Sequence, residues 1–321
     1  MNLIFKKKSY CFKLSTKVEN SKTTYLKKSG WIIKLKNNDK KIGFGEVSPL
    51  LKEDLKKCEE QLNMIPEYVE VLNLSEKINI FHPCIQSAIN SALAEINGKI
   101  IFKENYFFDA IDKTAILLNP NNVISNLNEI KKSQSIIGKS VTIKWKVALK
   151  NNNDEEATLE EILGQIDNNI NLRIDANGSW EREIANRWAD ILKDNKNIDW
   201  LEQPLSVDDI DGLKELNKKI PVALDESLLK FPTLIDEWKG WQIRRPSQET
   251  NPMNLLKELK DKKGLRSLST SFETGIGRRW LFHLSSLQLL GPTPKVPGLA
   301  LKKNPNSFLF LNEPQKIWDK L

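Results

Sequence analysis

Histidine is nearly absent from this sequence, with only His82 and His283 among its 321 residues. His82 precedes a proline at the expected start of a helix, and His283 lies in a helical run, so we expect structural roles for both. This scarcity argues against a hydrolase with a serine–histidine–aspartate triad and against a histidine-rich metal site. Any chemistry of this chain must therefore use carboxylates and lysines.

Cysteine is scarce as well. Cys11, Cys58 and Cys84 match no zinc-binding spacing, and an odd number is a poor basis for a disulfide framework. A reducing compartment is the simplest inference, and we expect a cytoplasmic protein. No apolar run is long enough to span a membrane, and the first residues, MNLIFKKKSY, lack the apolar core of a signal peptide. We therefore expect a soluble protein with no membrane partner.

A concentrated basic stripe is also missing. The chain has 49 Lys and Arg against 42 Asp and Glu, a net charge of +7, but the lysines are scattered along it. Scattered lysines indicate a solvated surface, and without a recognisable motif we expect no nucleic-acid partner. A hydrophobic content of 40% over 321 residues fits a globular protein with one large α/β barrel plus an added domain, or with two domains.

The first part of the chain, to about residue 45, is rich in strand-forming residues. The stretch GWIIKLKNNDKKIGFGEVSPL predicts a hairpin whose turn is the cluster 37–39. Helices are predicted over 52–64 and 83–98, the second with a proline near its start and a glycine at its end. This region is therefore an α+β unit.

From about residue 113 the pattern changes to alternating strands and helices. The predicted strands are 115–119, 141–149, 171–176, 198–204, 221–227, 240–246, 266–273 and 295–299. The predicted helices between them include 155–167, 180–192, 207–218 and 253–263. Seven or eight such alternations favour a parallel (β/α) barrel over an open doubly wound sheet, and the last twenty residues are expected to pack on the first unit.

Three acidic residues stand at the ends of successive predicted strands: Asp175, Glu202 and Asp225. Each alone could cap a helix, since Asp and Asn side chains bond nearby backbone N–H groups. Capping does not explain all three in consecutive positions, which meet at one mouth of a barrel. Together the carboxylates would repel one another, and a hard divalent cation such as Mg²⁺ relieves that repulsion.

One strand earlier, Lys144 and Lys146 lie two residues apart and share a strand face, opposite Trp145. Inward lysines are costly in a purely structural core but suit a cluster of acids and a metal. Their mutual repulsion and the cation should lower the pKa of at least one, which would make it a usable general base. The alternative is an edge strand with both lysines in solvent.

Across the barrel, the strand WQIRRP carries Arg244 and Arg245, of which only one can point inward. Arginine stays protonated in proteins, so the inward one is a fixed cation and a poor proton acceptor.

With these residues in place, the chain resembles the enolase superfamily. The segments that carry the resemblance are, in order, GFGEVSPL, INSALAEI, TIKWKV, RIDANGSW, WLEQP, ALDES, SLSTSFETGIG and VPGL. The resemblance implies an enolase-superfamily (β/α)-barrel over 113–299 with an N-terminal α+β capping domain over 1–112, completed by 300–321. More narrowly, the pattern is similar to a dehydratase of menaquinone and phylloquinone biosynthesis.

This resemblance implies that Asp175, Glu202 and Asp225 hold Mg²⁺, with Mn²⁺ as a substitute. Lys146 would be the catalytic base of a syn dehydration of a small carboxylate substrate, and Lys144 would support the base or the substrate carboxylate. Ser269 and Ser271, on one strand face, would touch the substrate. The stretches KTTYLKKSG and GEVSPL would close over it.

The sequence departs from the family at one position. Where the family usually has a lysine before the proline of the sixth strand, this chain has Arg245 before Pro246. A racemase needs a base on each face of the carbon, so an arginine there favours a one-base dehydration, although the inward residue could be Arg244. The alternatives are a cycloisomerase, an N-acylamino-acid racemase or a non-catalytic metal-binding homologue. The oligomeric state, monomer or homo-oligomer, stays open.

Overall fold

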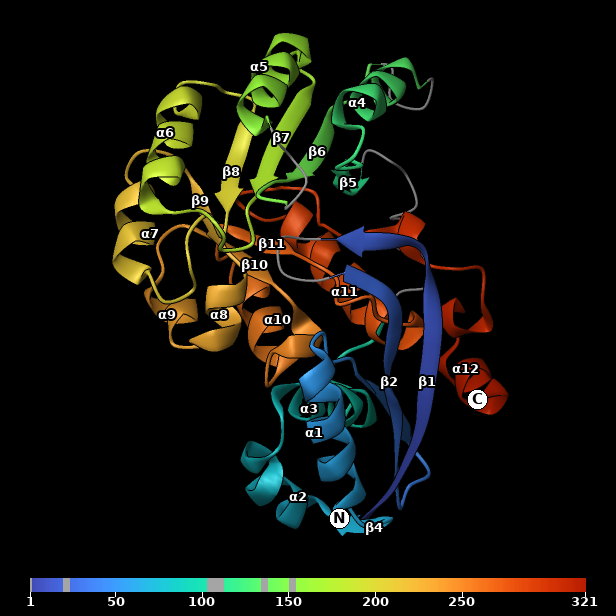
Figure 1. The fold of residues 1–321 in the computed structure, drawn as a ribbon. Coiled ribbons are helices and arrows are strands. Elements are labelled where there is room, and N and C mark those ends of the chain that lie inside the picture. Colours follow the sequence, from blue (N-terminus) through green and yellow to red (C-terminus); the bar gives the residue numbers. More distant parts are fainter. Residues whose placement is uncertain (1, 20–23, 103–112, 134–137, 150–153) are drawn as a thin grey trace.

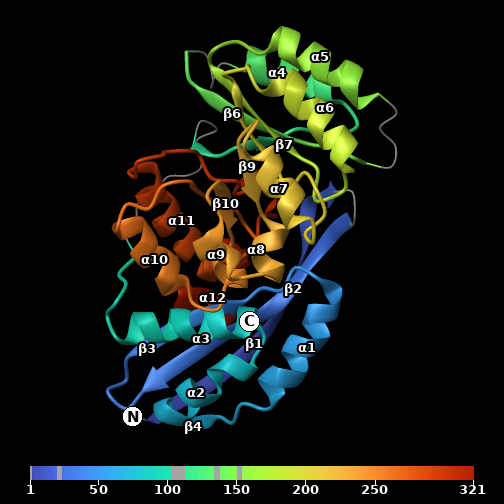
Figure 2. The same ribbon diagram turned by 90° about the vertical axis from the view of Figure 1, so that its left-hand side faces the viewer.

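Two β-sheets organise the protein, one antiparallel and one parallel (Figures 1 and 2). The computed structural model describes residues 2–19, 24–102, 113–133, 138–149 and 154–321. Within these ranges, no helix combines the length and apolar character needed to cross a membrane.

The antiparallel sheet has four strands in the spatial order β3-β2-β1-β4. They are β1 (Asn2–Glu19), β2 (Thr24–Asn37), β3 (Ile42–Val47) and β4 (Tyr68–Glu70). β2 and β3 form the predicted hairpin, with Trp31 opposite Val47 and Lys36 opposite Ile42. The turn lies at the predicted cluster 37–39 and closes through Lys40, whose φ of 64° is left-handed. The hairpin prediction is confirmed.

Three helices accompany this sheet: α1 (Lys52–Asn63), α2 (Val71–Lys77) and α3 (Pro83–Ile96). The helices predicted over 52–64 and 83–98 are α1 and α3. α3 lies so close to β3 that a Cβ on Gly45 would stand 1.9 Å from the carbonyl oxygen of Ala88. The Ala/Ser face of α3 and the glycines of β3 are therefore what allow the helix to cover the sheet.

The parallel sheet has seven strands in sequential order, β5 to β11. They are β5 (Ile116–Leu117), β6 (Val141–Lys146), β7 (Ile170–Asp175), β8 (Ile198–Glu202), β9 (Val222–Leu224), β10 (Trp241–Arg244) and β11 (Arg266–Leu268). Each corresponds to a predicted strand, although most end earlier than expected. The sheet curls, and the helices that follow its strands pack on its outside (Figure 1).

The eighth predicted strand, 295–299, is not a full strand but joins the two edges of this sheet. Gly298 donates to the carbonyl of Leu268 at the end of β11 and accepts from the backbone N–H of Thr270. On the other side, Ala115 donates to the carbonyl of Pro297 just before β5. These bonds close the curled sheet into the expected barrel.

Helices that follow the strands cover the outside of the barrel. They are α4 (Val123–Lys132), α5 (Glu155–Gln165), α6 (Arg182–Leu192), α7 (Ile210–Leu216), α8 (Glu226–Lys230), α9 (Leu234–Glu237), α10 (Pro252–Lys260) and α11 (Gly275–Leu289). The predicted helices 155–167, 180–192, 207–218 and 253–263 are found as α5, α6, α7 and α10. The short α8 and α9 were missed, because a turn or two of helix leaves little periodicity to detect.

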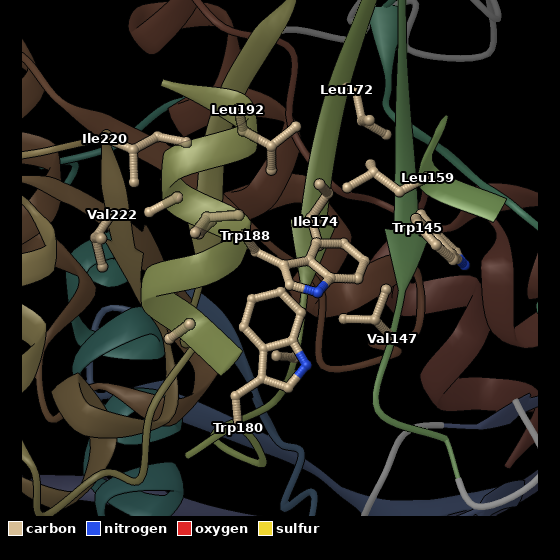
Figure 3. Close-up of a cluster of buried hydrophobic side chains, with 14 of the residues drawn as sticks. Trp145, Val147, Leu159, Leu172, Ile174, Trp180, Trp188, Leu192, Ile220 and Val222 are labelled. Atoms are coloured by element: carbon tan, nitrogen blue, oxygen red, sulfur yellow. The ribbon is translucent and has the colours of Figure 1, made fainter. Parts of the chain in front are cut away.

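The outward face of β6 anchors this layer. Trp145 is fully buried and packs on Trp188 of α6, with ring centroids 5.7 Å apart (Figure 3). Trp188 in turn packs on Trp180, with ring centroids 4.7 Å apart. Burial of such large rings fixes which face of β6 points outward. Lys144 and Lys146 must then point to the inside of the barrel.

The N-terminal sheet is tied to the barrel and to the C-terminal helix α12 (Pro314–Lys320). Trp318 of α12 packs on Phe44 of β3 with ring centroids 6.3 Å apart. Glu46 of β3 accepts hydrogen bonds from Thr274 and Gly277 at the start of α11, and from Tyr10. The predicted domain boundary at 112 and 113 adjoins residues outside the described ranges, and the division remains a prediction.

Candidate active site

The three predicted metal-ligating acids lie at the C-terminal end of the parallel sheet. Asp175 ends β7, Glu202 ends β8 directly beside it in the ladder, and Asp225 follows β9. Their exposed fractions are 1%, 2% and 1%. Buried carboxylates need compensating charge, so their partners decide what the site can do.

Lys144 and Lys146 of β6 supply part of this charge. Lys144 Nζ lies 2.8 Å from Asp175 Oδ2 and 2.6 Å from Glu202 Oε1. Lys146 Nζ donates to Asp175 Oδ2 at 3.1 Å and to Asn177 Oδ1 at 3.0 Å. Both lysines thus face the acids from one strand face, as the alternation predicted.

The charges shift the titration of these groups. Burial alone would lower the pKa of Lys144, but the charges of Asp175 and Glu202 outweigh it and raise that pKa. Burial acts to raise the pKa of Asp175, yet the two lysines hold it below its usual range. The expected lowering of a lysine pKa therefore does not apply to Lys144, because its ammonium lies 2.8 Å from Asp175 and 2.6 Å from Glu202.

The sixth barrel strand, β10, resolves the choice between its two arginines. Arg244 turns away from the barrel mouth and binds Glu249 at 2.6 Å and Glu258 at 3.1 Å. Arg245 faces the acids: its Nε donates to Asp225 Oδ1 at 2.8 Å and its Nη2 to Asp225 Oδ2 at 2.6 Å. Arg245 is therefore the residue that faces the site.

Two site residues were missed in the sequence, Asn177 and Glu226. Asn177 has a left-handed φ of 48°, and its side chain links Lys146 to Glu226, donating from Nδ2 to Oε1 at 2.9 Å. Burial, with the charges of Asp225 and Asp175, raises the pKa of Glu226 to about 7. The only signal was their position, since each lies one or two residues after a predicted ligand.

Most of these groups, but not Asp175 or Glu202, line a cavity of about 620 Å³. Lys144, Lys146, Asp225 and Arg245 lie on its wall, together with Ser269. Ser271 does not line it: its side chain is fully buried and its backbone N–H donates to Glu273. Of the two serines predicted to touch the substrate, Ser269 therefore lies on the cavity wall, whereas Ser271 lies beyond the end of β11 at Leu268 and away from that wall.

The N-terminal unit also contributes residues to the wall of the cavity. Tyr25, from the stretch KTTYLKKSG, and Leu50, from GEVSPL, both line it, whereas residues 22 and 23 of the first stretch lie outside the described ranges. His82, expected to be structural, accepts from the N–H of Cys84 at the start of α3, and its Nε2 lies 3.3 Å from Asp54. That pair also lines the cavity.

The donor set suits a hard divalent cation by chemical type, since carboxylate oxygens are the ligands that Mg²⁺ prefers. The Lys144 ammonium already occupies a position between Asp175 and Glu202. Asp225, however, is bound by Arg245, and among the described residues no three acidic, histidine or cysteine side chains converge closely enough to hold an ion. Asp175 and Glu202 thus share the ammonium of Lys144, whereas Asp225 is paired with Arg245.

Comparisons with known sequences agree with this architecture. Residues 138–236 match the family described as enolase C-terminal domain-like. The chain is 30% identical over 193 residues to o-succinylbenzoate synthase of Thermosynechococcus vestitus, covering 56% of this chain and 59% of that protein. It is 27% identical over 155 residues to N-succinyl-L-Arg/Lys racemase of Bacillus cereus, covering 46% and 41%. The alignments therefore span less than two thirds of either relative.

The whole fold has a solved counterpart. The crystal structure of o-succinylbenzoate synthase from Thermosynechococcus elongatus BP-1, complexed with Mg in its active site, superposes with a TM-score of 0.78. The superposition covers 99% of this chain and 100% of that one at 22% identity. At this identity the similarity demonstrates the fold, not the reaction. This protein thus has the enolase-superfamily fold, and its sequence resembles that of o-succinylbenzoate synthase.

Proposed function

We propose that this protein is an o-succinylbenzoate synthase. In this proposal it removes water from 2-succinyl-6-hydroxy-2,4-cyclohexadiene-1-carboxylate to give 2-succinylbenzoate, a step of menaquinone or phylloquinone biosynthesis. The observation that carries the proposal is the pair Lys144 and Lys146, which line the cavity and bind the buried carboxylates of Asp175 and Glu202. Cations on the wall of a cavity favour a small carboxylate as substrate.

Asp175, Glu202 and Asp225 are the residues that would hold Mg²⁺, with Mn²⁺ as the second candidate. When bound, the ion would supply positive charge beside the substrate carboxylate, where negative charge develops as the α-proton leaves. Lys144 adds a fixed positive charge at the same place, since its neighbours favour the ammonium form.

Lys146 is the proposed general base. Hydrogen bonds to Asp175 and Asn177 fix its amine on the wall of the cavity. In its neutral form it would take the proton from the α-carbon and then return it to the departing hydroxyl, which leaves as water from the same face. The ring then becomes aromatic, so the second step is strongly downhill. One base on one face is sufficient for this reaction.

Arg245 supports a dehydration over a racemisation. It lies across the cavity from Lys146, is held by two bonds to Asp225, and cannot act as a proton acceptor at neutral pH. A racemase remains the second candidate, because a racemase is among the relatives of similar identity.

A paired assay tests the proposal. The purified protein with Mg²⁺ should convert the cyclohexadiene carboxylate to an aromatic product, followed by its ultraviolet absorbance. In parallel, N-succinyl arginine in D₂O should show no useful α-proton exchange by NMR. Exchange without dehydration would assign the protein to the racemases, and metal binding without turnover of either substrate would identify a non-catalytic homologue.

A further inference from the structure

The pair formed by Arg245 and Asp225 occupies both oxygens of one proposed metal ligand. Nε and Nη2 of Arg245 donate to Oδ1 and Oδ2 at 2.8 and 2.6 Å, and Nη1 donates to the carbonyl of Thr270. The guanidinium is therefore held in a parallel, two-bond geometry inside a buried site. Such charge-assisted pairs are the strongest hydrogen bonds that side chains make.

This arrangement separates Asp225 from the other acids. Asp175 and Glu202 share the ammonium of Lys144, whereas Asp225 is turned to a cation that no physiological pH can neutralise. An ion bound to Asp225 would compete with the guanidinium for the same oxygens and would be repelled by its charge.

We propose that the Arg245 guanidinium competes with the metal for Asp225. A divalent cation then gains Asp225 as a ligand only when the guanidinium is displaced from that carboxylate. This inference rests on the proposed metal site and concerns how that site is filled. Arg245 would then regulate the affinity for metal in addition to lining the cavity.

A second partner for the released guanidinium is already present. Glu226 follows Asp225 directly, and its Oε2 is buried with no hydrogen-bond partner among the described residues. Its other oxygen is held by Asn177, and its negative charge already acts on Arg245. Glu226 is therefore the acceptor that we assign to the released guanidinium.

The coupling sets an order of binding. Because Arg245 also lines the cavity, its guanidinium is free to meet an anionic group of the substrate only after the metal has displaced it. Metal should therefore bind first and increase the affinity for a carboxylate ligand, and by linkage the carboxylate should increase the affinity for metal.

Calorimetric titration with MgCl₂ alone tests the proposal. Removing the competing charge in Arg245→Gln should tighten Mg²⁺ binding by at least about tenfold. Arg245→Lys, which keeps the charge but loses the two-bond geometry, should fall between this variant and the unmodified protein. Arg182→Gln is the matched control, because Arg182 binds Asp209 through two nitrogens at the surface, away from the cluster. Its Mg²⁺ affinity should not change.

The outcomes separate this inference from the proposed function. If the unmodified protein and Arg245→Gln bind Mg²⁺ equally within about twofold, Arg245 is no competitor, although the metal site stands. If only Arg245→Gln binds Mg²⁺, the competition is upheld and the unmodified protein loses its proposed metal. If neither binds, both ideas fail. Should Arg245→Gln not fold, the same comparison is made with Arg245→Lys, whose unchanged affinity would overturn the proposal.

The role of Glu226 is tested by a double-mutant cycle on the same measurement. Glu226→Gln should weaken Mg²⁺ binding more in the unmodified protein than in the Arg245→Gln background. Only the unmodified protein has an Arg245 guanidinium that the Glu226 carboxylate can accept when the metal displaces it. An equal effect in both backgrounds would remove Glu226 as the acceptor.

Discussion

Lys144 on β6 and Glu202 on β8 are joined across the intervening strand β7 by a hydrogen bond of 2.6 Å between Nζ and Oε1. The same nitrogen lies 2.8 Å from Asp175 Oδ2 on β7. One ammonium therefore balances two buried carboxylates on neighbouring strands. In the folded chain the Lys144 ammonium is thus the positive charge that lies between them.

Removing this ammonium should make the protein depend on divalent cations for stability. Lys144→Met leaves two buried carboxylates without a shared counter-charge, and in the presence of EDTA it should lower the free energy of unfolding by about 3–5 kcal/mol. Mg²⁺ should restore part of this loss. Urea unfolding with and without Mg²⁺ measures both effects, and Lys131→Met is the control, because Lys131 is exposed and donates to the backbone carbonyl of Gln165. Equal stability of Lys144→Met and the control would contradict the balancing role.

Lys146 carries a prediction on turnover. Lys146→Ala should lower kcat by about 10²–10⁴-fold, the usual contribution of a positioned general base. KM should change little and the circular dichroism spectrum should be preserved, since the outer face of β6 packs through Trp145 and not through the lysines. Near-normal turnover in the dehydration assay would exclude Lys146 as the base.

The barrel and the location of the site could be predicted from local patterns. Strand–helix alternation placed Asp175, Glu202 and Asp225 at the ends of adjacent parallel strands, and period-two alternation placed Lys144 and Lys146 on one face. These features depend on short stretches of chain, in which the spacing of residues along the sequence directly sets the direction of their side chains.

The pairings within the site could not be predicted in this way. Whether Arg245 would reach Asp225 depends on side-chain geometry between two strands, and the misplacement of Ser271 followed from where β11 ends. The link from Glu46 to Thr274 joins positions 228 residues apart, and no periodicity carries such a contact. In the sequence, Glu46 is distinguished only as part of the segment GFGEVSPL.

The close approach of α3 to β3 gives a prediction on stability. In Gly45→Ala the new Cβ would stand 1.9 Å from the carbonyl oxygen of Ala88, a backbone atom that cannot rotate away. The helix must shift, and we expect a loss of about 3 kcal/mol or more in the free energy of unfolding.

Gly164→Ala is the matched control for this change. Gly164 lies in α5 with open space around its Cβ position, so alanine should stabilise the protein there by about 0.5 kcal/mol through helix propensity alone. Opposite signs for the two variants in urea unfolding are the expected result. A loss of similar size at both positions would mean that α3 does not press on β3.

Lys28 gives a prediction on pH. Its Nζ is buried and donates to the carbonyls of Ser48 and Pro49 at 3.0 and 2.6 Å, which holds the segment that leads to the cavity wall at Leu50. Burial lowers the pKa of Lys28 from 10.5 to about 8, against the opposing charge of Glu273. The native protein therefore releases this proton at a lower pH than the unfolded chain does.

Between pH 8 and 10.5 the unfolded state binds more protons than the native state at Lys28, so this residue makes the free energy of unfolding rise with pH. Lys28→Met loses this dependence, while the cost of leaving the two carbonyls without a donor is the same at every pH. The stability of the unmodified protein relative to Lys28→Met should therefore increase by roughly 2 kcal/mol from pH 7.5 to 9.5, measured by urea unfolding. A constant difference across this range would mean that Lys28 titrates as a solvated lysine, and that the segment at Ser48 is not held by a buried ammonium.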